Sequence, residues 1–284
     1  MKILRVVSEL DFGGVEQVLG NSLPRLVKMK GLEVFVLVLG KGGRISQSLE
    51  AEGIKIEIFN HNPRIPNLKS LFRLIKIFKS FKPNVLHCQG SEANFHGLIA
   101  ARIAGVPVRI GEEIGFPNHH SYWKYIFRLV YKNATKVIAI SQAVKDRIVE
   151  LEEVEEGKVE VVYNPVIIGE RKKAKDERET LRYTQSDVNN GEKKKPFVFV
   201  TTCRLVPVKN LDRLITAFAR LCDEFSEIAI ELWIVGDGPL RETLENQSKE
   251  LGVSDKVKFW GFQENVFLFL EKADVFVLPS LSEG

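Results

Sequence analysis

The 284-residue sequence lacks any long hydrophobic run, which limits the classes of protein to which it can belong. Its longest apolar stretches, such as 34–39, fall far short of the roughly 18 residues that a membrane-spanning helix needs. The first eight residues mix Lys2 and Arg5 with apolar side chains and offer no small-residue cleavage site. They therefore predict a core strand and not a signal peptide.

Cysteine is also scarce. Cys88, Cys203 and Cys222 lie in or beside apolar segments, share no metal-ligand spacing and leave an odd number for pairing. We expect reduced thiols in a cytosolic protein. An Asp-rich cluster is missing as well, so the sequence predicts no metal site.

The whole chain has little excess charge of either sign, since its net charge is +4. The two halves nevertheless differ in the sign of their net charge. Residues 1–149 carry 22 Lys and Arg against 11 Asp and Glu, whereas the remainder carries 19 against 26. A basic first half could meet a phosphorylated substrate or an anionic membrane. No nucleic-acid recognition motif accompanies this charge, so we expect no nucleic-acid partner.

Short strand-like runs alternate with longer helix-like segments along most of the chain. This alternation is typical of parallel sheets covered by helices on both faces, and it predicts an α/β protein with doubly wound domains. The apolar runs that predict strands are 2–8, 32–39, 54–59, 84–88, 107–111, 136–140, 159–163, 197–202, 228–235, 256–260 and 274–279. The periodic segments that predict helices are 15–29, 67–81, 91–104, 119–132, 141–150, 209–225, 239–251 and 264–272.

The alternation breaks once, between Gly169 and Lys195, where charged and small polar residues dominate. Such a segment cannot bury enough apolar surface to fold by itself. We therefore expect an N-terminal domain over 1–166, an exposed linker over 167–195 and a C-terminal domain over 196–284. Because doubly wound domains bind ligands at the carboxyl ends of their strands, a cleft between the two domains is the expected site.

Two cations follow the predicted strand at 197–202. Arg204 and Lys209 stand just before a predicted helix that opens near Leu211. Fixed cations beside a helix N-terminus are well suited to hold a diphosphate. Arg204 and Lys209 are therefore the first candidates for a functional site.

Glycine pairs follow two other predicted strands. Gly13 and Gly14 precede one helix, and Gly236 and Gly238 precede another. Glycine lets the backbone approach a ligand closely, and a helix N-terminus offers unpaired N–H groups to an anion. A tight structural turn explains each pair equally well, and neither forms the three-glycine dinucleotide fingerprint.

A further strand end, at 259–262, joins a small residue to aromatic side chains. Gly261 and Phe262 could leave room for the flat face of a base, whereas Phe259 and Trp260 are expected in the core. The run at 274–279 then leads into a polar turn that contains Glu283.

In their order and spacing these segments resemble the retaining glycosyltransferases of family 4, within the GT-B superfamily. The resemblance covers nearly the whole chain and rests on the segments 13–16, 204–209, 236–239, 259–261 and 278–284. It implies two Rossmann-like domains, of which the second is incomplete here. It also implies transfer of a sugar from a UDP- or GDP-sugar to a glycan or lipid-linked acceptor, with retention of anomeric configuration.

The resemblance implies roles for individual residues. Arg204 and Lys209 would bind the donor diphosphate, and Glu283 would contact the donor sugar as the first glutamate of a paired motif. The remaining donor-site candidates would be Gly13, Gly14, Gly236, Gly238, Gly261 and Phe262. No metal or other cofactor is implied, because the nucleotide sugar is a substrate.

The family's second glutamate lies further along the chain than Gly284, where this sequence stops. We therefore expect a member truncated within the C-terminal domain. A non-catalytic protein that binds nucleotide sugars or glycans is the alternative function, in which the missing segment has removed the activity.

On the acceptor side, many relatives carry a histidine at the strand end where this sequence has Glu112 and Glu113. Either carboxylate could orient or deprotonate an acceptor hydroxyl, and solvated or helix-capping carboxylates are the alternative. His119 follows a few residues on, and His87 ends another predicted strand. For His87 the alternative is a histidine held by structural hydrogen bonds.

Two helical segments, 68–82 and 122–132, mix cations with apolar side chains. Both could rest on an anionic bilayer and present the site to a lipid-linked acceptor, or both could be ordinary surface helices. In the first case the protein would be peripheral at the inner face of the membrane. The cations proposed for this contact are Lys69, Arg73, Lys76 and Lys79.

Overall fold

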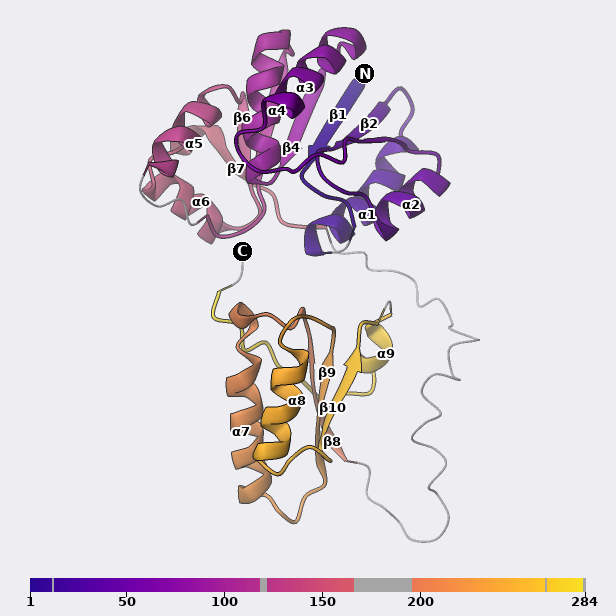
Figure 1. The fold of residues 1–284 in the computed structure, drawn as a ribbon, viewed down its shortest axis with the longest axis vertical. Helices are drawn as coiled ribbons and strands as arrows, with labels where there is room; N and C mark the ends of the chain where they lie inside the picture. The colour runs from indigo at the N-terminus through magenta and orange to yellow at the C-terminus, as the bar shows by residue number, and fades with distance from the viewer. Residues whose placement is uncertain (12, 118–121, 166–195, 264, 283–284) are drawn as a thin grey trace. The chain divides into compact units, whose positions relative to one another are not determined.

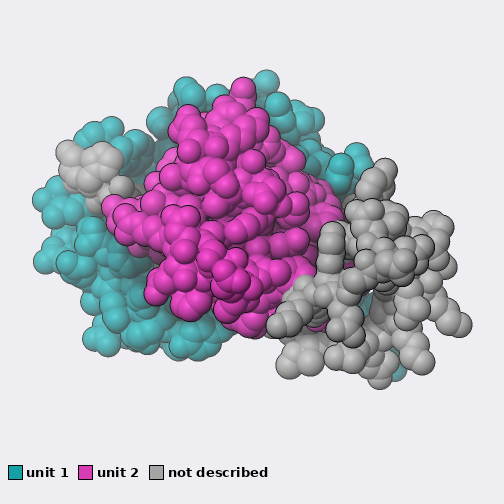
Figure 2. Space-filling view, turned by 90° about the horizontal axis from the view of Figure 1, so that it is seen from below, with its two compact units in different colours: residues 1–170, 284 teal, residues 171–283 magenta. Residues whose placement is uncertain are grey.

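The computed structural model describes residues 1–284 except 12, 118–121, 166–195, 264 and 283–284. The backbone divides into two compact units, residues 1–170 and residues 171–283 (Figure 2). Each unit has its own parallel sheet (Figure 1). The linker expected at 167–195 lies outside the described residues, so its limits stay a prediction.

The first unit is built on a seven-stranded sheet in the order β3-β2-β1-β4-β5-β6-β7, and every described pairing in it is parallel. The first strand, β1, lies inside the sheet between β2 and β4, as in other doubly wound sheets. The strands are β1 (Lys2–Val7), β2 (Glu33–Val38), β3 (Lys55–Ile58), β4 (Val85–Gln89), β5 (Val108–Glu113), β6 (Lys136–Ala139) and β7 (Val159–Val161).

Helices cover both faces of this sheet. Because successive strand residues point to opposite faces, Leu4 and Val6 pack with α3, α4 and α5, whereas Val7 packs with α1 and α2. The helices are α1 (Gly14–Val27), α2 (Arg44–Ala51), α3 (Leu68–Phe81), α4 (Ser91–Ala104), α5 (Trp123–Lys132) and α6 (Gln142–Glu150).

The second unit holds a four-stranded parallel sheet in the order β10-β9-β8-β11. Helices α7 and α8 lie together on one side of the sheet, and the short α9 lies on the other (Figure 1). The elements are β8 (Phe197–Thr202), α7 (Leu211–Glu224), β9 (Ile230–Val235), α8 (Arg241–Glu250), β10 (Val257–Gly261), α9 (Phe267–Leu270) and β11 (Val275–Phe276). The predicted fold class, α/β with two parallel-sheet units, is confirmed.

The predicted elements are wrong in three places. Helix α2 was not predicted, because only Ile45 and Leu49 supply its apolar side and glycines precede it. The strand expected at 274–279 forms ladder pairs only over Val275–Phe276, and the helix expected at 264–272 is confined to Phe267–Leu270. Backbone hydrogen bonds still extend beyond both elements, because Asp274 N–H and Val277 N–H donate to β8 at 2.9 and 2.8 Å, and Glu271 N–H donates to the Phe267 carbonyl at 2.9 Å.

Among the described residues, every helix is too short or too polar to cross a bilayer.

Candidate functional site

The loop after β8 carries both predicted phosphate-binding cations. Lys209 closes a 3-10 turn that begins at Pro207, and Asn210 then turns the chain into α7 with a left-handed backbone conformation. Arg204 is exposed and Lys209 is half-buried. Within the part of the chain that the structure describes, no hydrogen bond or ion pair engages the Arg204 guanidinium.

Gly236 and Gly238 are required because this loop lies directly against them. Cys203 N–H donates to the carbonyl of Val235, the last residue of β9, and Leu205 N–H donates to that of Asp237 in the following loop, both at 3.0 Å. A Cβ atom at Gly236 would lie 1.9 Å from the Cys203 carbonyl oxygen, and one at Gly238 would lie 2.5 Å from that of Leu205. Side chains at these glycines would displace the loop that carries Arg204.

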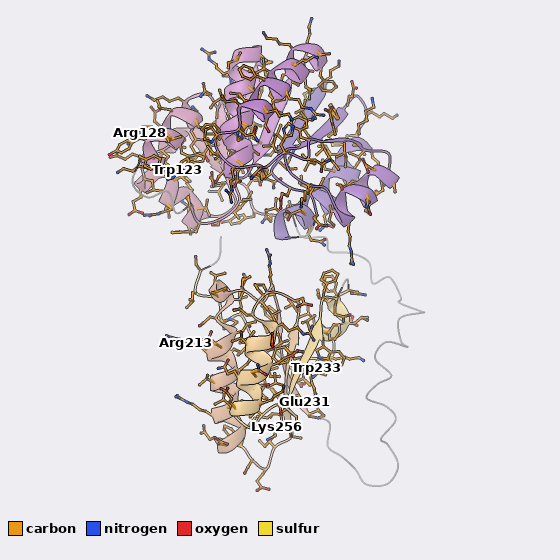
Figure 3. All side chains as sticks on the ribbon, viewed as in Figure 1. Trp123, Arg128, Arg213, Glu231, Trp233 and Lys256 are labelled. Atoms are coloured by element: carbon orange, nitrogen blue, oxygen red, sulfur yellow. The ribbon has the colours of Figure 1, made fainter. Side chains whose placement is uncertain are left out.

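The end of β10 is tied to the same loops. Gly236 N–H donates to the Gly261 carbonyl at 2.8 Å, and Gly261 has a φ of 67°, in the left-handed region that favours glycine. Phe262, next along the chain, is exposed. Trp260 packs edge-to-face against Trp233, with ring centroids 5.4 Å apart, so it belongs to the core as expected. Figure 3 labels Trp233.

The segment after β11 runs along the Arg204–Lys209 loop. Leu281 N–H donates to the Val208 carbonyl at 2.9 Å, and the Asn210 side-chain amide donates to the Pro279 carbonyl at 3.0 Å. Glu283 itself lies outside the described residues. These two hydrogen bonds bring the residues that precede it alongside the loop of the predicted cations.

In the first unit, Gly13 and Gly14 open helix α1. Gly13 is the N-cap, and its carbonyl accepts from Gln17 N–H at 3.0 Å. A Cβ atom at Gly13 would lie 2.3 Å from Glu16 Oε2, whereas a Cβ atom at Gly14 would meet no atom within 4 Å. Only the end of the Glu16 side chain therefore approaches Gly13, and the space beside Gly14 is open.

His87 and Glu112 lie together in a closed ring of four side chains, here called the β1–β4–β5 ring, with Arg5 and Gln89. Arg5 Nη1 lies 2.8 Å from His87 Nδ1, and Arg5 Nη2 donates to Gln89 Oε1 at 3.0 Å. Gln89 Nε2 donates to Glu112 Oε1 at 3.1 Å, and His87 Nε2 lies 2.7 Å from Glu112 Oε2. Both carboxylate oxygens of Glu112 thus face partners inside the protein.

The electrostatics of the ring follow from its burial. Burial, with the nearby Arg5 charge, lowers the pKa of His87 despite the opposing effect of Glu112. Burial alone would raise the pKa of Glu112, but the contacts with His87, Arg5 and Gln89 outweigh it and lower that pKa. At neutral pH the ring therefore holds a cationic Arg5, a neutral His87 and an anionic Glu112.

Arg5 was not proposed as a site residue from the sequence. The available signal was a cation in the middle of an apolar strand, which on its own only argues against a signal peptide. Its partners come from β4 and β5, which lie more than 80 residues further along the chain.

Glu113 occupies a separate buried pocket on the other face of β5. It accepts hydrogen bonds from the Tyr131 hydroxyl and from Asn94 Nδ2, the latter at 3.3 Å. Burial and the charge of Glu113 raise the pKa of Tyr131. Since Glu112 is 6% exposed and Glu113 is 3% exposed, the expectation of solvated carboxylates is wrong for both.

The basic outer faces of α3 and α5 differ from the sequence expectation in one respect. Arg73 is not a free surface cation, because it pairs with Glu57 at 2.8 Å and stacks over the Phe59 ring at 4.1 Å, although its side chain is 39% exposed. Lys69, Lys76 and Lys79 are exposed, and so is Phe72, at 66%. On α5, near Trp123 and Arg128 in Figure 3, the exposed apolar side chains are Tyr122, Tyr125 and Leu129.

His119, like Glu283, lies outside the described residues, so the structure does not place it. Over the described ranges, which omit both residues, no group of three or more His, Cys, Asp or Glu side chains could hold a metal ion.

Comparison with known proteins assigns the chain to a family. Residues 12–169 match Glycosyltransferase Family 4, and residues 182–284 match the glycosyl transferases of group 1. The first match alone covers more than half of the sequence. The chain belongs to Glycosyltransferase Family 4. The resemblance inferred from the five sequence segments is thereby confirmed, and with it the GT-B type of fold.

Relatives of this family 4 chain include an Escherichia coli UDP-Gal:alpha-D-GlcNAc-diphosphoundecaprenol alpha-1,3-galactosyltransferase, 30% identical over 78% of this chain and 58% of the relative. Another is the putative glycosyltransferase EpsF of Bacillus subtilis, 24% identical over the whole of this chain and 74% of its own length. Among solved structures, Anabaena HepE in complex with UDP has a TM-score of 0.76 and 22% identity, covering 99% of this chain and 75% of HepE. This chain thus spans little more than half of its Escherichia coli relative.

Proposed function

We propose that this protein transfers a sugar from a UDP- or GDP-sugar to a glycan or lipid-linked acceptor, with retention of anomeric configuration. The observation that carries the proposal is the loop of Arg204 and Lys209, held at the carboxyl edge of a parallel sheet by two glycines that admit no side chain. Family membership and the donor named for the Escherichia coli relative support the same chemistry.

The mechanism follows from the charge that develops during transfer. When the bond between sugar and diphosphate breaks, negative charge grows on the leaving phosphate and the sugar becomes cationic. Arg204 and Lys209 would stabilise that phosphate because their charges are already in place before the reaction. We propose that Glu283 contacts the donor sugar and that Gly261 and Phe262 lie near the base. No protein nucleophile and no metal enter the proposal.

The first unit would supply the acceptor side. Gly13 and Gly14 would face the donor phosphates at the start of α1, where unpaired N–H groups favour an anion. His119 remains a candidate beside the acceptor. For Glu112 and Glu113 we now propose a positioning role, because a base must present a carboxylate oxygen to the acceptor hydroxyl and these oxygens face internal partners.

A calorimetric titration with UDP and with GDP tests the donor site. We expect one of the two nucleotides to bind, and Arg204→Ala to weaken that binding by about 10- to 100-fold, as expected for the loss of charge-assisted hydrogen bonds. Arg213→Ala, on the exposed side of α7 (Figure 3), is the matched control and should bind as the wild type does. If neither nucleotide binds the folded protein, the donor-site proposal fails.

A measurement of turnover distinguishes the proposed transferase from the alternative, a binding protein without activity. Release of free nucleotide from a panel of UDP- and GDP-sugars, measured with and without lipid-diphosphate acceptors, would establish transfer. Binding without any release at enzyme concentrations that saturate the donor would favour the binding protein.

A lipid-linked acceptor would place the protein at a membrane, and we propose contact with the cytoplasmic leaflet through α3 and α5. The exposed faces combine apolar side chains with Lys69, Lys76 and Lys79, and neither helix contains an acidic residue. Such faces favour an anionic bilayer. The three cysteines are unpaired, which suits a reducing compartment.

Flotation with phosphatidylglycerol-containing vesicles tests this contact. We expect the protein to float, and the triple change of Lys69, Lys76 and Lys79 to glutamate to abolish flotation. Phe72→Ser should weaken it, whereas neutral phosphatidylcholine vesicles should not bind. Unchanged flotation of the triple variant would exclude α3 as the contact.

A further inference from the structure

The β1–β4–β5 ring lies outside the proposed donor site, and its geometry allows a single protonation state. An arginine guanidinium carries only donors. Since Arg5 Nη1 lies 2.8 Å from His87 Nδ1, that nitrogen must present its lone pair. A neutral His87 therefore carries its proton on Nε2. Glu112 Oε2 lies 2.7 Å from this nitrogen, although the angles between the two groups are not those of a hydrogen bond. Arg5 thus fixes both the tautomer and the charge of His87.

The charged groups that face His87 are Arg5 from β1 and Glu112 from β5. Gln89, from the same strand as His87, is uncharged and closes the ring between Arg5 and Glu112. Glu92, at the start of α4, accepts a hydrogen bond from Ser8 at 3.0 Å. The side chains of Arg5, His87 and Glu112 are 12%, 14% and 8% exposed, so water screens their interactions only weakly.

The ring is connected to the point where β4 passes into α4. Gln89 directly precedes Gly90, which has a φ of 90° and caps α4. Gly90 N–H donates to the Glu112 carbonyl at 3.0 Å. Asn94, in the first turn of α4, accepts from Glu112 N–H at 3.2 Å and donates to the Glu112 carbonyl at 3.0 Å. Three hydrogen bonds therefore join the backbone of Glu112 to the start of α4.

We propose that Arg5 is a positioning residue and that the β1–β4–β5 ring is an acid-sensitive latch on the carboxyl edge of the first unit. A proton taken up at His87 Nδ1 occupies the lone pair that Arg5 uses. The guanidinium then loses its acceptor and meets a second positive charge within the same buried ring, so the Arg5 contact breaks. The start of α4, held through Gln89 and Glu112, loosens with it. Any effect of the latch on an acceptor rests on the proposed function, which assigns the acceptor side to the first unit. The latch itself does not depend on that function.

Nitrogen NMR of the histidine-labelled full chain tests the latch without any substrate. His87 is assigned by the resonance that disappears in His87→Gln. We expect this histidine to be neutral, with its proton on Nε2, at pH 6.5, where a free histidine is about half protonated. Below its midpoint, the amide resonances of the first turn of α4 should shift together with the imidazole. A protonated His87 at neutral pH, or a proton on Nδ1, would overturn the proposal.

Two variants separate the effect of Arg5 from a general loss of structure. In Arg5→Met the lone pair on Nδ1 is released, so a larger fraction of His87 should be protonated at every pH of the titration. Arg5→Lys keeps a cationic donor and should restore most of the wild-type titration. If Arg5→Met does not fold, the proposal is decided by the wild-type measurements, which are the tautomer of His87 and the amide shifts of the first turn of α4. If it folds and titrates like the wild type, Arg5 does not control His87.

Discussion

The carboxyl ends of the two sheets use charge in opposite ways. In the first unit Arg5, His87 and Glu112 are buried and contact one another. In the second unit Arg204 is exposed, on a loop whose backbone is fixed against Gly236 and Gly238. We call the edge with Arg5, His87 and Glu112 the locked edge, because its charged side chains contact one another. We call the edge with Arg204 the open edge, because its cation is exposed to solvent.

This difference separates stability from binding. Removing one partner of a buried charge pair leaves the other partner uncompensated in a poorly screened environment, which is costly. Removing an exposed cation costs the fold almost nothing, and its effect appears only when an anionic ligand is present. Removing a charged side chain should therefore lower the stability of the first unit at the buried ring. At Arg204 it should lower the affinity for an anionic ligand instead.

The largest expected effect is on the locked edge. Glu112→Ala leaves Arg5 buried without its counter-charge and should lower the unfolding free energy of the first unit by about 3–5 kcal/mol. Hydrogen exchange of the slowest β4 amides measures this value for that unit. Glu160→Ala, at an exposed pair with Lys136, is the control and should change little. A loss below about 1 kcal/mol for Glu112→Ala would mean that the ring does not hold this edge.

An intermediate effect is expected where the open edge depends on backbone contact. Gly238→Ala places a Cβ atom 2.5 Å from the Leu205 carbonyl oxygen, so the cation-bearing loop must move. We expect a loss of about 2 kcal/mol in the slowest exchange of β8 and β9, together with weaker nucleotide binding. Gly252→Ala is the control for backbone strain, because Gly252 has a φ of 69° but an added Cβ would meet no atom within 4 Å, and it should leave nucleotide binding unchanged. If Gly238→Ala bound the nucleotide with wild-type affinity, the position of the loop that carries Arg204 would not matter for nucleotide binding.

The smallest effect concerns pH and distinguishes the two units. Burial lowers the pKa values of His61, His87 and His96 in the folded protein. The unfolded chain therefore binds more protons below about pH 6.5, and stability that is complete above that value is lost as the pH falls. The second unit contains no histidine, so it should keep its stability between about pH 6.5 and 5.

The His87→Gln variant should lose less stability than the wild type over the same range, as measured by pH-dependent unfolding. Glu112 acts in a lower window, because its pKa is depressed and its contribution disappears only as the pH falls below the usual carboxyl range. Equal pH dependence of the two units would contradict this assignment.

The strands and the open edge could be predicted from the sequence, because both depend on local patterns. Buried parallel strands are apolar runs, and Arg204 and Lys209 follow one of them directly. Helix α2 could not be predicted, since two large apolar residues in eight give too weak a period.

The locked edge could not be predicted because it depends on register between strands. Arg5 lies opposite His87, and Gln89 lies opposite Glu112, only once β1, β4 and β5 have paired. For the same reason, the sequence does not show why glycine is required at positions 236 and 238. The requirement comes from the backbone of the neighbouring loop, which lies against both residues. Side chains at a strand end are readable in sequence, but their partners across the sheet are not.

The most direct measurement of the central claim takes whichever of UDP and GDP binds and compares it with the corresponding monophosphate, in the wild type and in Arg204→Ala. If Arg204 binds the diphosphate, the wild type should prefer the diphosphate over the monophosphate, and the variant should lose most of that preference while its affinity for the monophosphate changes little. An unchanged preference for the diphosphate in the variant, with the fold intact, would show that the open edge is not the phosphate site.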